Sequence, residues 1–276
     1  MKTILKWTGI VFGGLIGLAV LAGLVLYPIG MEKLTRSYPG IPVETVSIPT
    51  GPDAVARGSH IAIVRKCAEC HGENLGGKLL TDDPILGTIP ASNLTSGKGG
   101  IGKSYSDTDW IRAIRHGVKP DGRVEVFMYD YSTKSDQDLG ALIAYLKQIP
   151  QVDSHYPATR FGPVVPIAPA IGVFTPAAEL IDHGAPRTTD PMPGATIEYG
   201  RYLFAVCSQC HGTNLAGKLE DWKREDFIRA VRTGVLPNGK HLSPAMPLKT
   251  SSDMNDTQLT ALWLYLQSSP QALMQK

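Results

Sequence analysis

An uncharged, strongly apolar run lies near the start of the chain. It extends from Trp7 to Met31 and is preceded by Lys2 and Lys6. A helix of this length would reach about 37 Å at 1.5 Å per residue, and a bilayer core is about 30 Å thick. The pattern therefore predicts one transmembrane helix over residues 1–31, able to cross the membrane with some tilt.

A cleaved signal peptide is the alternative interpretation of this run. Signal peptides have an apolar region of about 7–15 residues and a small-residue cleavage site, whereas this run is longer and passes through Leu24-Val25-Leu26-Tyr27-Pro28. We therefore expect the helix to be retained as an anchor. Because the lysines precede the helix, the positive-inside rule predicts a cytoplasmic N-terminus and places the chain after Tyr27 in the periplasm or another extracytoplasmic space.

Two further helices, far apart in the chain, have matching patterns of apolar and polar residues. Residues Asp109–Val118 match residues Asp226–Val235 at an offset of 117. Gly117 and Gly234 occupy positions typical of C-terminal helix caps. The matched patterns predict an internal repeat.

A final helix is predicted at the end of each copy of the repeat. Ser135 and Asn255 are the expected N-terminal caps. Leucines recur at the spacing that buries one face of a helix; they are Leu139, Leu142 and Leu146 in the first copy and Leu259, Leu262 and Leu266 in the second.

Each copy also begins with a helix. We expect Tyr145 and Tyr265, in the final helices, to pack on these first helices near Gly58 and Gly200. The glycine lies nine residues before the next cysteine in the first copy and seven in the second, so the spacing leaves this contact open.

The same five-residue motif follows the first helix in each copy. It is Cys67-Ala68-Glu69-Cys70-His71 in the first copy and Cys207-Ser208-Gln209-Cys210-His211 in the second. Cys-x-x-Cys-His is the pattern at which haem c is attached. The two thiols can form thioether bonds to one porphyrin, and the adjacent neutral imidazole can ligate its iron. We therefore expect two covalently bound haem c groups, with His71 and His211 as iron ligands.

Other uses of a Cys-x-x-Cys pair fit the sequence less well. A thioredoxin-like pair would need one motif in a βαβ setting, and a structural zinc site would need four ligands brought together. The two motifs use all four cysteines of the chain, so no thiol is left for a disulfide.

The similarity between the copies continues after each motif. Residues 71–79 and 211–219 agree at seven of nine positions. The offset between the copies is 140 at the motifs and 117 at the later helices, so the first copy carries about 23 extra residues. Residues 82–105 contain Pro, Gly, Ser and Asn throughout, and we expect them to form a loop.

The repeat and the prolines between its copies suggest the domain organisation. The stretch between the copies contains eight prolines and no amphipathic period, which is typical of an extended linker. The expected segments are a transmembrane anchor at 1–31, a stalk at 32–52, a first domain at 53–150, the Pro-rich linker at 151–195 and a second domain at 196–276.

The composition excludes one class of partner. The 276 residues include 27 Lys plus Arg and 25 Asp plus Glu. A chain so nearly neutral has no excess of basic residues with which to bind a polyanion such as nucleic acid. Its hydrophobic fraction of 43% is enough for small cores, and in each small domain a porphyrin would be a large part of the apolar interior.

Each copy contains a first helix, a Cys-x-x-Cys-His motif, an Asn-Leu-x-Gly segment, a middle helix, a Met-containing segment and a final helix. In this order of features the chain resembles two fused class I cytochrome c domains. The resemblance implies an all-α fold, covalent haem and one-electron transfer. Segments Ala91–Thr95, Gly100–Gly102 and Tyr105–Asp107 make the first copy similar to the membrane-anchored multihaem cytochrome subunits of periplasmic dehydrogenases.

The resemblance also suggests the sixth iron ligands. Residues 243–247, Ser-Pro-Ala-Met-Pro, match the family's Met-ligand segment, so Met246 is the expected distal ligand of the second haem. Residues 126–129, Val-Phe-Met-Tyr, come to the same place in the first copy but lack the flanking prolines. Met128 is therefore the expected ligand of the first haem, with Met192 or another residue as the alternative.

Arginines and histidines give weaker signals. Arg112 and Arg115 recur as Arg229 and Arg232, where they could bind a haem propionate or solvate a helix surface. Five histidines have no counterpart in the repeat and are expected to be ordinary surface or loop residues; they are His60, His116, His155, His183 and His241.

Two classes of function follow from these features. The first is an anchored electron carrier, without catalytic residues, in a respiratory chain. It would take single electrons from a membrane or periplasmic donor, such as a dehydrogenase or a quinol-oxidising complex, and pass them to an oxidase or a soluble cytochrome. His/Met ligation favours it because both axial positions of each iron would be filled.

The second class of function is a haem enzyme, such as a dihaem peroxidase or a thiosulfate-oxidising cytochrome. Such an enzyme needs an open or unusually ligated iron, and the absence of prolines beside Met128 favours it.

Overall fold

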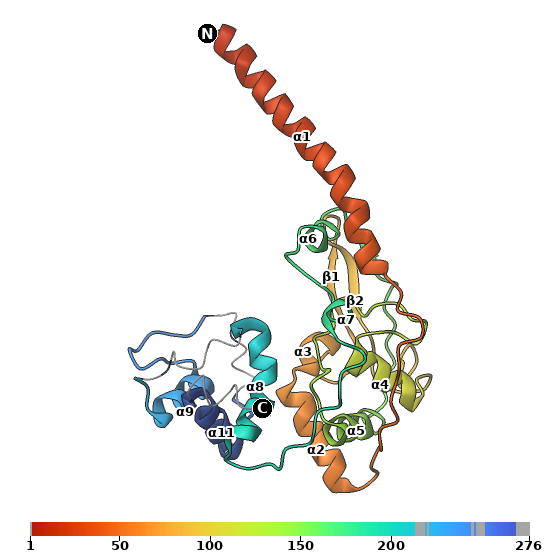
Figure 1. Ribbon diagram of the computed structural model, residues 1–276. Coiled ribbons are helices and arrows are strands. Elements are labelled where there is room, and N and C mark those ends of the chain that lie inside the picture. Colours follow the sequence, from red (N-terminus) through yellow and green to blue (C-terminus); the bar gives the residue numbers. More distant parts are fainter. Residues whose placement is uncertain (1, 213–218, 220, 244–245, 247–251, 269–276) are drawn as a thin grey trace. The chain divides into compact units, whose positions relative to one another are not determined.

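The structure is a computed structural model that describes residues 2–212, 219, 221–243, 246 and 252–268 (Figure 1). Contacts within the chain divide it into two compact units, each made of separate stretches of sequence. Unit 1 consists of the chain up to Glu44, Cys70–Asp130 and Pro150–Gly184, and unit 2 consists of Thr45–Glu69, Tyr131–Ile149 and the chain from Ala185 onward.

Unit 1 begins with α1, a helix of 34 residues at Lys2–Thr35. Its large apolar side chains from Trp7 to Val25 are exposed. In the described part of the chain, α1 is the one helix that is long and apolar enough to cross a membrane. The predicted helix is therefore present, and it continues past Pro28 to end four residues beyond the predicted boundary.

Unit 1 also contains a three-stranded antiparallel sheet in the order β1-β2-β3. The strands are β1 at Lys78–Asp83, β2 at Gly87–Ala91 and β3 at Arg160–Phe161. The predicted all-α fold and the predicted loop are therefore not confirmed in this region. The side chains of β1 are exposed or half-buried on both faces, so the strand lacks the apolar–polar alternation from which it could have been predicted.

The stretch predicted to be an extended linker packs partly within unit 1. It contributes β3 and two short helices, α6 at Ile167–Ala170 and α7 at Ala177–Leu180. Pro166, Pro169 and Pro176 are fully buried. The extended Pro-rich linker is thus not confirmed, because several of its prolines are packing residues rather than parts of a solvated chain.

The C-terminal end of α1 packs on these short helices (Figure 1). A Cβ atom at Gly30 would lie 1.6 Å from the carbonyl oxygen of Pro166, the residue before α6, so only glycine permits this close contact. Lys33 and Arg36 form ion pairs of 3.2 and 3.3 Å with Glu179 of α7. The anchor helix is therefore joined to unit 1 by packing and by charge.

In unit 2, two pairs of helices repeat one packing arrangement. Helix α2, Pro52–Val64, packs on α5, Asp136–Leu146. Helix α8, Ile197–His211, packs on α11, Asp256–Gln267. These are the first and final helices that the sequence predicts for the two copies.

A glycine permits the close contact in each pair. A Cβ atom at Gly58 would lie 2.0 Å from the carbonyl oxygen of Ala141 and 2.8 Å from Cβ of Tyr145. At Gly200 the equivalent distances to α11 are also 2.0 and 2.8 Å, with Tyr265 in the place of Tyr145. The predicted contacts of both tyrosines with these glycines are confirmed.

The middle helix of each copy lies close to its predicted position. Helix α4 spans Asp107–His116 and α9 spans Arg224–Thr233. Both end at a glycine in the left-handed region, with φ of 63° at Gly117 and 76° at Gly234. Helices α5 and α11 likewise begin after the two capping residues that the sequence predicts, Ser135 and Asn255, whose side chains accept backbone N–H groups of the first turn.

Candidate functional site

The first Cys-x-x-Cys-His motif forms a short helix of its own. Helix α3 spans Cys67–His71 and is separated from α2 by Arg65 and Lys66. Lys66 has a φ of 64°, in the left-handed region, so the helical path is interrupted there. Both cysteines of the motif are half-buried.

The second motif is instead the end of the continuous helix α8. Cys207 is half-buried and His211 is exposed, while the side chain of Cys210 lies outside the described part of the structure. This difference explains the unequal spacing from glycine to cysteine. The first copy accommodates its two extra residues at the break formed by Arg65 and Lys66, so the packing glycine keeps the same contacts in both copies.

A backbone carbonyl of unit 1 holds the imidazole of His71. Its Nδ1 lies 2.8 Å from the carbonyl oxygen of Ser92. A carbonyl oxygen can only accept, so Nδ1 carries the proton and Nε2 keeps its lone pair. Burial lowers the pKa of His71 below its ordinary value, although the hydrogen bond to Ser92 opposes this shift. A neutral imidazole with a fixed tautomer is suited to be an iron ligand.

Two buried donors test whether the surroundings fit a haem. Trp110 in α4 is 2% exposed, and among the described residues its Nε1 has no hydrogen-bond partner. Arg65, two residues before Cys67, is 5% exposed, and its Nη1 also lacks a partner there. An unpaired buried donor costs about 1–3 kcal/mol. Haem propionates are strong acceptors for such groups, so each donor, taken by itself, has the chemistry that a haem propionate would satisfy.

The two predicted methionine ligands occupy equivalent turns. The N–H of Met128 donates to the carbonyl of Glu125 at 3.3 Å, and that of Met246 donates to the carbonyl of Ser243 at 2.8 Å. Both methionines are half-buried. Met192, the alternative, is 86% exposed, which favours Met128. The two prolines beside Met246 in the sequence lie outside the described residues, and ligation by either methionine stays a prediction.

Two of the four repeated arginines pair with acidic residues of their own helices. Arg112 lies 2.8 Å from Asp109, and Arg229 lies 2.7 Å from Asp226, one helical turn away in each case. These pairs favour the interpretation of a solvated helix surface for Arg112 and Arg229. Arg115, in contrast, is buried.

The prediction that the unmatched histidines are ordinary surface residues is wrong for His116. Its side chain is buried, with Nδ1 3.0 Å from Nδ1 of His183 and Nε2 3.3 Å from a carboxylate oxygen of Glu44. Burial lowers the pKa of His116, and the Glu44 carboxylate opposes this shift. The second copy has Thr233 at the equivalent position, so the repeat carried no sign of this cluster. His155 is exposed, as predicted.

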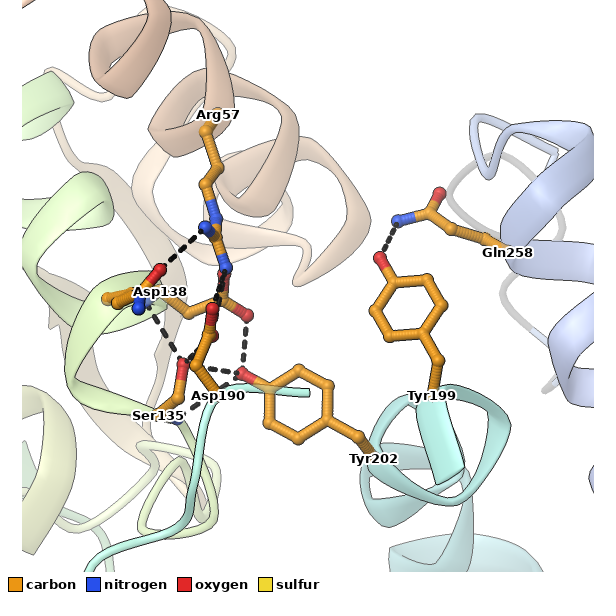
Figure 2. Close-up of polar contacts among 8 residues, drawn as sticks. Arg57, Ser135, Asp138, Asp190, Tyr199, Tyr202 and Gln258 are labelled. Carbon is orange, nitrogen blue, oxygen red and sulfur yellow. Dashed lines mark hydrogen bonds and ion pairs between the residues drawn. The ribbon is translucent and has the colours of Figure 1, made fainter. Parts of the chain in front are cut away.

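A polar cluster in unit 2 joins α2, α5 and α8 (Figure 2). Arg57 forms ion pairs of 2.7 Å with Asp138 and 2.9 Å with Asp190. The hydroxyl of Tyr202 donates to Asp138 and accepts the N–H of Ser135 at 3.2 Å. Because these buried and half-buried groups are partners for one another, the cluster stabilises the helices that lead into the two motifs.

Two features of unit 1 that support the haem interpretation could not be identified from the sequence. Ser92 acts through its backbone carbonyl, and it follows β2 in a region predicted to be a loop. Trp110 matches Phe227 in the repeat, so it has the pattern of a core residue. A backbone contact leaves no side-chain signal, and an indole donor without a partner can be recognised only once its surroundings are known.

Comparison with family models identifies both copies of the repeat. The model described as "Cytochrome c" matches residues 55–150. The model described as "Cytochrome C oxidase, cbb3-type, subunit III" matches residues 195–266.

Curated relatives are cytochrome subunits of dehydrogenases. The chain is 27% identical over 272 residues to the fructose dehydrogenase cytochrome subunit of Gluconobacter japonicus, a match that covers 83% of this chain and 55% of the relative. It is 33% identical over 173 residues to the gluconate 2-dehydrogenase cytochrome c subunit of Pantoea cypripedii, covering 57% and 37%. It is 28% identical over 185 residues to the alcohol dehydrogenase (quinone) cytochrome c subunit of Gluconacetobacter polyoxogenes, covering 58% and 37%.

The chain therefore spans about half, or less, of the length of these relatives. The family matches include both Cys-x-x-Cys-His motifs, and covalent attachment of haem c is the common property of such domains. From these matches and from the named relatives, the chain belongs to the c-type cytochromes and is similar to the cytochrome subunits of dehydrogenases.

Proposed function

We propose that the chain is a membrane-anchored dihaem cytochrome c that carries single electrons from a dehydrogenase to an oxidase or a soluble cytochrome. The observation that carries this proposal is the hydrogen bond between His71 and the Ser92 carbonyl, in a motif that recurs at His211. It leaves Nε2 of His71 available for iron. When bound, haem c supplies the one-electron chemistry of ferric and ferrous iron.

The chain's own residues would hold each haem through two thioether bonds, a His ligand and a Met ligand. The thioether bonds, the proximal ligands and the distal ligands are assigned to Cys67, Cys70, His71 and Met128 for the first haem and to Cys207, Cys210, His211 and Met246 for the second. The buried donors on Trp110 and Arg65 are each, taken separately, suited to bind a propionate oxygen.

Filled axial positions favour electron transfer over catalysis. If one His and one Met both ligate each iron, neither iron would have a position open to a substrate, so we assign no substrate chemistry to this chain. The alternative, a haem enzyme such as a dihaem peroxidase or a thiosulfate-oxidising cytochrome, requires that one Met ligand be absent. The matching turns of Met128 and Met246 argue against it.

The proposed location follows from α1. Lys2 and Lys6 precede the apolar helix, which supports a cytoplasmic N-terminus and haem domains in the periplasm. The relatives are named for dehydrogenases of fructose, gluconate and alcohol. We therefore propose as the electron donor a dehydrogenase that oxidises a small hydroxylated compound.

Carbon monoxide binding to the dithionite-reduced holoprotein separates the two functions. If both irons have two protein ligands, the visible spectrum should not change on mixing with carbon monoxide. The Met246→Ala variant is the positive control, because it should open one iron and give an adduct. A rapid adduct at one haem of the unmodified protein would support the enzyme instead.

Respiration in native membranes tests the relay itself. Without this chain, the dehydrogenase should still reduce an artificial soluble acceptor, but oxygen uptake with its substrate should be lost. A variant that lacks all four haem-attachment cysteines is the matched control and should behave like the deletion. Unchanged oxygen uptake in either case would contradict the proposed role.

A further inference from the structure

We propose that unit 1 rests on the membrane through an apolar patch beside the end of α1, which enters the headgroup region of the bilayer. The patch consists of Ile85, Leu86, Val164, Ile171 and Val173, whose exposed fractions are 57, 45, 40, 56 and 76%. This inference rests on the proposed role of α1 as a membrane anchor.

The packing of α6 on α1 places this patch at the level of the membrane surface. The apolar run of α1 ends at Met31, and the residue before it, Gly30, contacts Pro166 at the start of α6. Since a helix rises 1.5 Å per residue, Gly30 is within about 2 Å of the end of the run along the axis. An element packed on Gly30 therefore lies at the boundary between the hydrocarbon core and the headgroups if α1 spans the bilayer.

The end of α1 is held to unit 1 by further contacts beyond the membrane boundary. Leu34 is buried, and Lys33 and Arg36 both pair with Glu179. Directly after the helix, the N–H of Tyr38 donates to the carbonyl of Gly122 at 2.8 Å. Such contacts keep unit 1 close to the end of the span, rather than lifting it away from the membrane.

The turn between β1 and β2 presents apolar side chains on this side of unit 1. The carboxylate of Asp83 accepts the N–H groups of Ile85 and Leu86 at 2.7 and 2.9 Å, which fixes the turn. The carbonyl of Ile85 accepts the N–H of Val164 at 3.4 Å, which joins the turn to the segment leading into α6. In Figure 1 the hairpin extends toward α6 and the end of α1.

Continuity with the anchor identifies lipid as the occupant of the patch. Single exposed apolar residues need no explanation, whereas a group of them beside a membrane span has a ready non-aqueous environment. Transfer of apolar surface from water is favourable by about 25 cal/mol per Å². An apolar face at the interface is also the mode by which peripheral segments bind bilayers. The patch would fix the orientation of unit 1 on the membrane.

Spin labels on the full-length holoprotein, reconstituted alone into phosphatidylcholine vesicles, test this proposal. Ile85→Cys and Ile171→Cys place labels in the patch. Leu18→Cys places a label within α1, and Thr108→Cys places one at an exposed position of α4, away from α6 (Figure 1). The native cysteines belong to the two haem motifs, so labelling of the unmodified protein measures the background.

The labels at Ile85 and Ile171 should be accessible to oxygen and protected from a water-soluble nickel chelate, like the label at Leu18. The label at Thr108 should be accessible to the chelate. If Leu18 is protected while Ile85 and Ile171 behave like Thr108, the patch proposal is overturned and the anchor stands. If Leu18 itself is accessible to the chelate, the anchor fails and the patch proposal with it. Patch labels protected from both reagents would indicate contact between copies of the chain, which also overturns the lipid proposal.

Discussion

At the scale of single residues, the two methionine segments are expected to differ in how firmly they hold iron. The sequence places Pro244 and Pro247 around Met246 and no proline beside Met128. Proline reduces the entropy lost when a loop is fixed in place. The hydrogen bond that the Met128 N–H donates to the Glu125 carbonyl is also longer, at 3.3 Å, than the one that the Met246 N–H donates to the Ser243 carbonyl, at 2.8 Å. We therefore expect the Met128 sulfur to leave iron first as pH or denaturant concentration rises.

Ferric titrations of Met128→Ala and Met246→Ala measure this difference. Each variant should lose one iron–sulfur charge-transfer band at the red end of the spectrum. The remaining band should disappear at a lower denaturant concentration in Met246→Ala, which retains Met128. Equal resistance would refute the proline argument, and two intact bands in Met128→Ala would show that Met128 is not a ligand.

The buried His116 should make stability depend on pH. Burial lowers its pKa below the ordinary value of 6.5, with the Glu44 carboxylate opposing and His183 and Arg115 assisting the shift. The unfolded chain therefore binds a proton there at a pH where the folded chain does not, so the free energy of unfolding should fall as pH decreases through about 6.5. Denaturant unfolding of the holoprotein between about pH 8 and pH 5 measures this. The pH dependence should be weaker in His116→Asn and unchanged in His155→Asn; equal slopes in both variants would contradict the assignment.

At the scale of elements, the paired helices of unit 2 depend on two glycines. Gly58→Ala and Gly200→Ala would each force a Cβ atom to 2.0 Å from a carbonyl oxygen, and we expect each to lower the free energy of unfolding by about 1–3 kcal/mol. Gly194→Ala is the control, because its nearest neighbour would be 3.6 Å away and the expected change is within about 0.5 kcal/mol. Denaturant unfolding of the three variants measures these losses. A loss at Gly194 as large as at the other two would contradict the packing argument.

The helices could be predicted because their signals are local. Leucine spacing, caps such as Ser135 and terminal glycines such as Gly117 all lie within the helices or next to them. The strands could not be predicted, because β1 has no buried face to impose an alternation of residue types. The burial of Pro166 and its neighbours depends on packing within unit 1, and a proline count alone suggests only an extended chain.

At the scale of the whole molecule, some candidate haem residues have local sequence signals, whereas others are recognised only from contacts made by the fold. The cysteines and histidines of both motifs can be named from the sequence, because attachment of haem c requires them at fixed short spacing, and their binding of haem stays a prediction. The carbonyl of Ser92 lies 21 residues from His71, and the two direct contacts of His116, with His183 and with Glu44, join residues 67 and 72 positions apart. Contacts of this range depend on the fold, so they could not be predicted from a single sequence. The domain boundaries proposed from the repeat stay a prediction.

The number of covalent haems per chain tests the central claim most directly. The holoprotein, matured with the cytochrome c assembly machinery, should have an intact mass equal to the polypeptide plus two haems, and the pyridine haemochrome assay should agree. Acidic acetone should extract no haem. Replacing both cysteines of either motif with alanine should leave one haem attached. A single haem in the unmodified protein, or haem that acidic acetone removes, would contradict the account of this chain as a dihaem electron carrier.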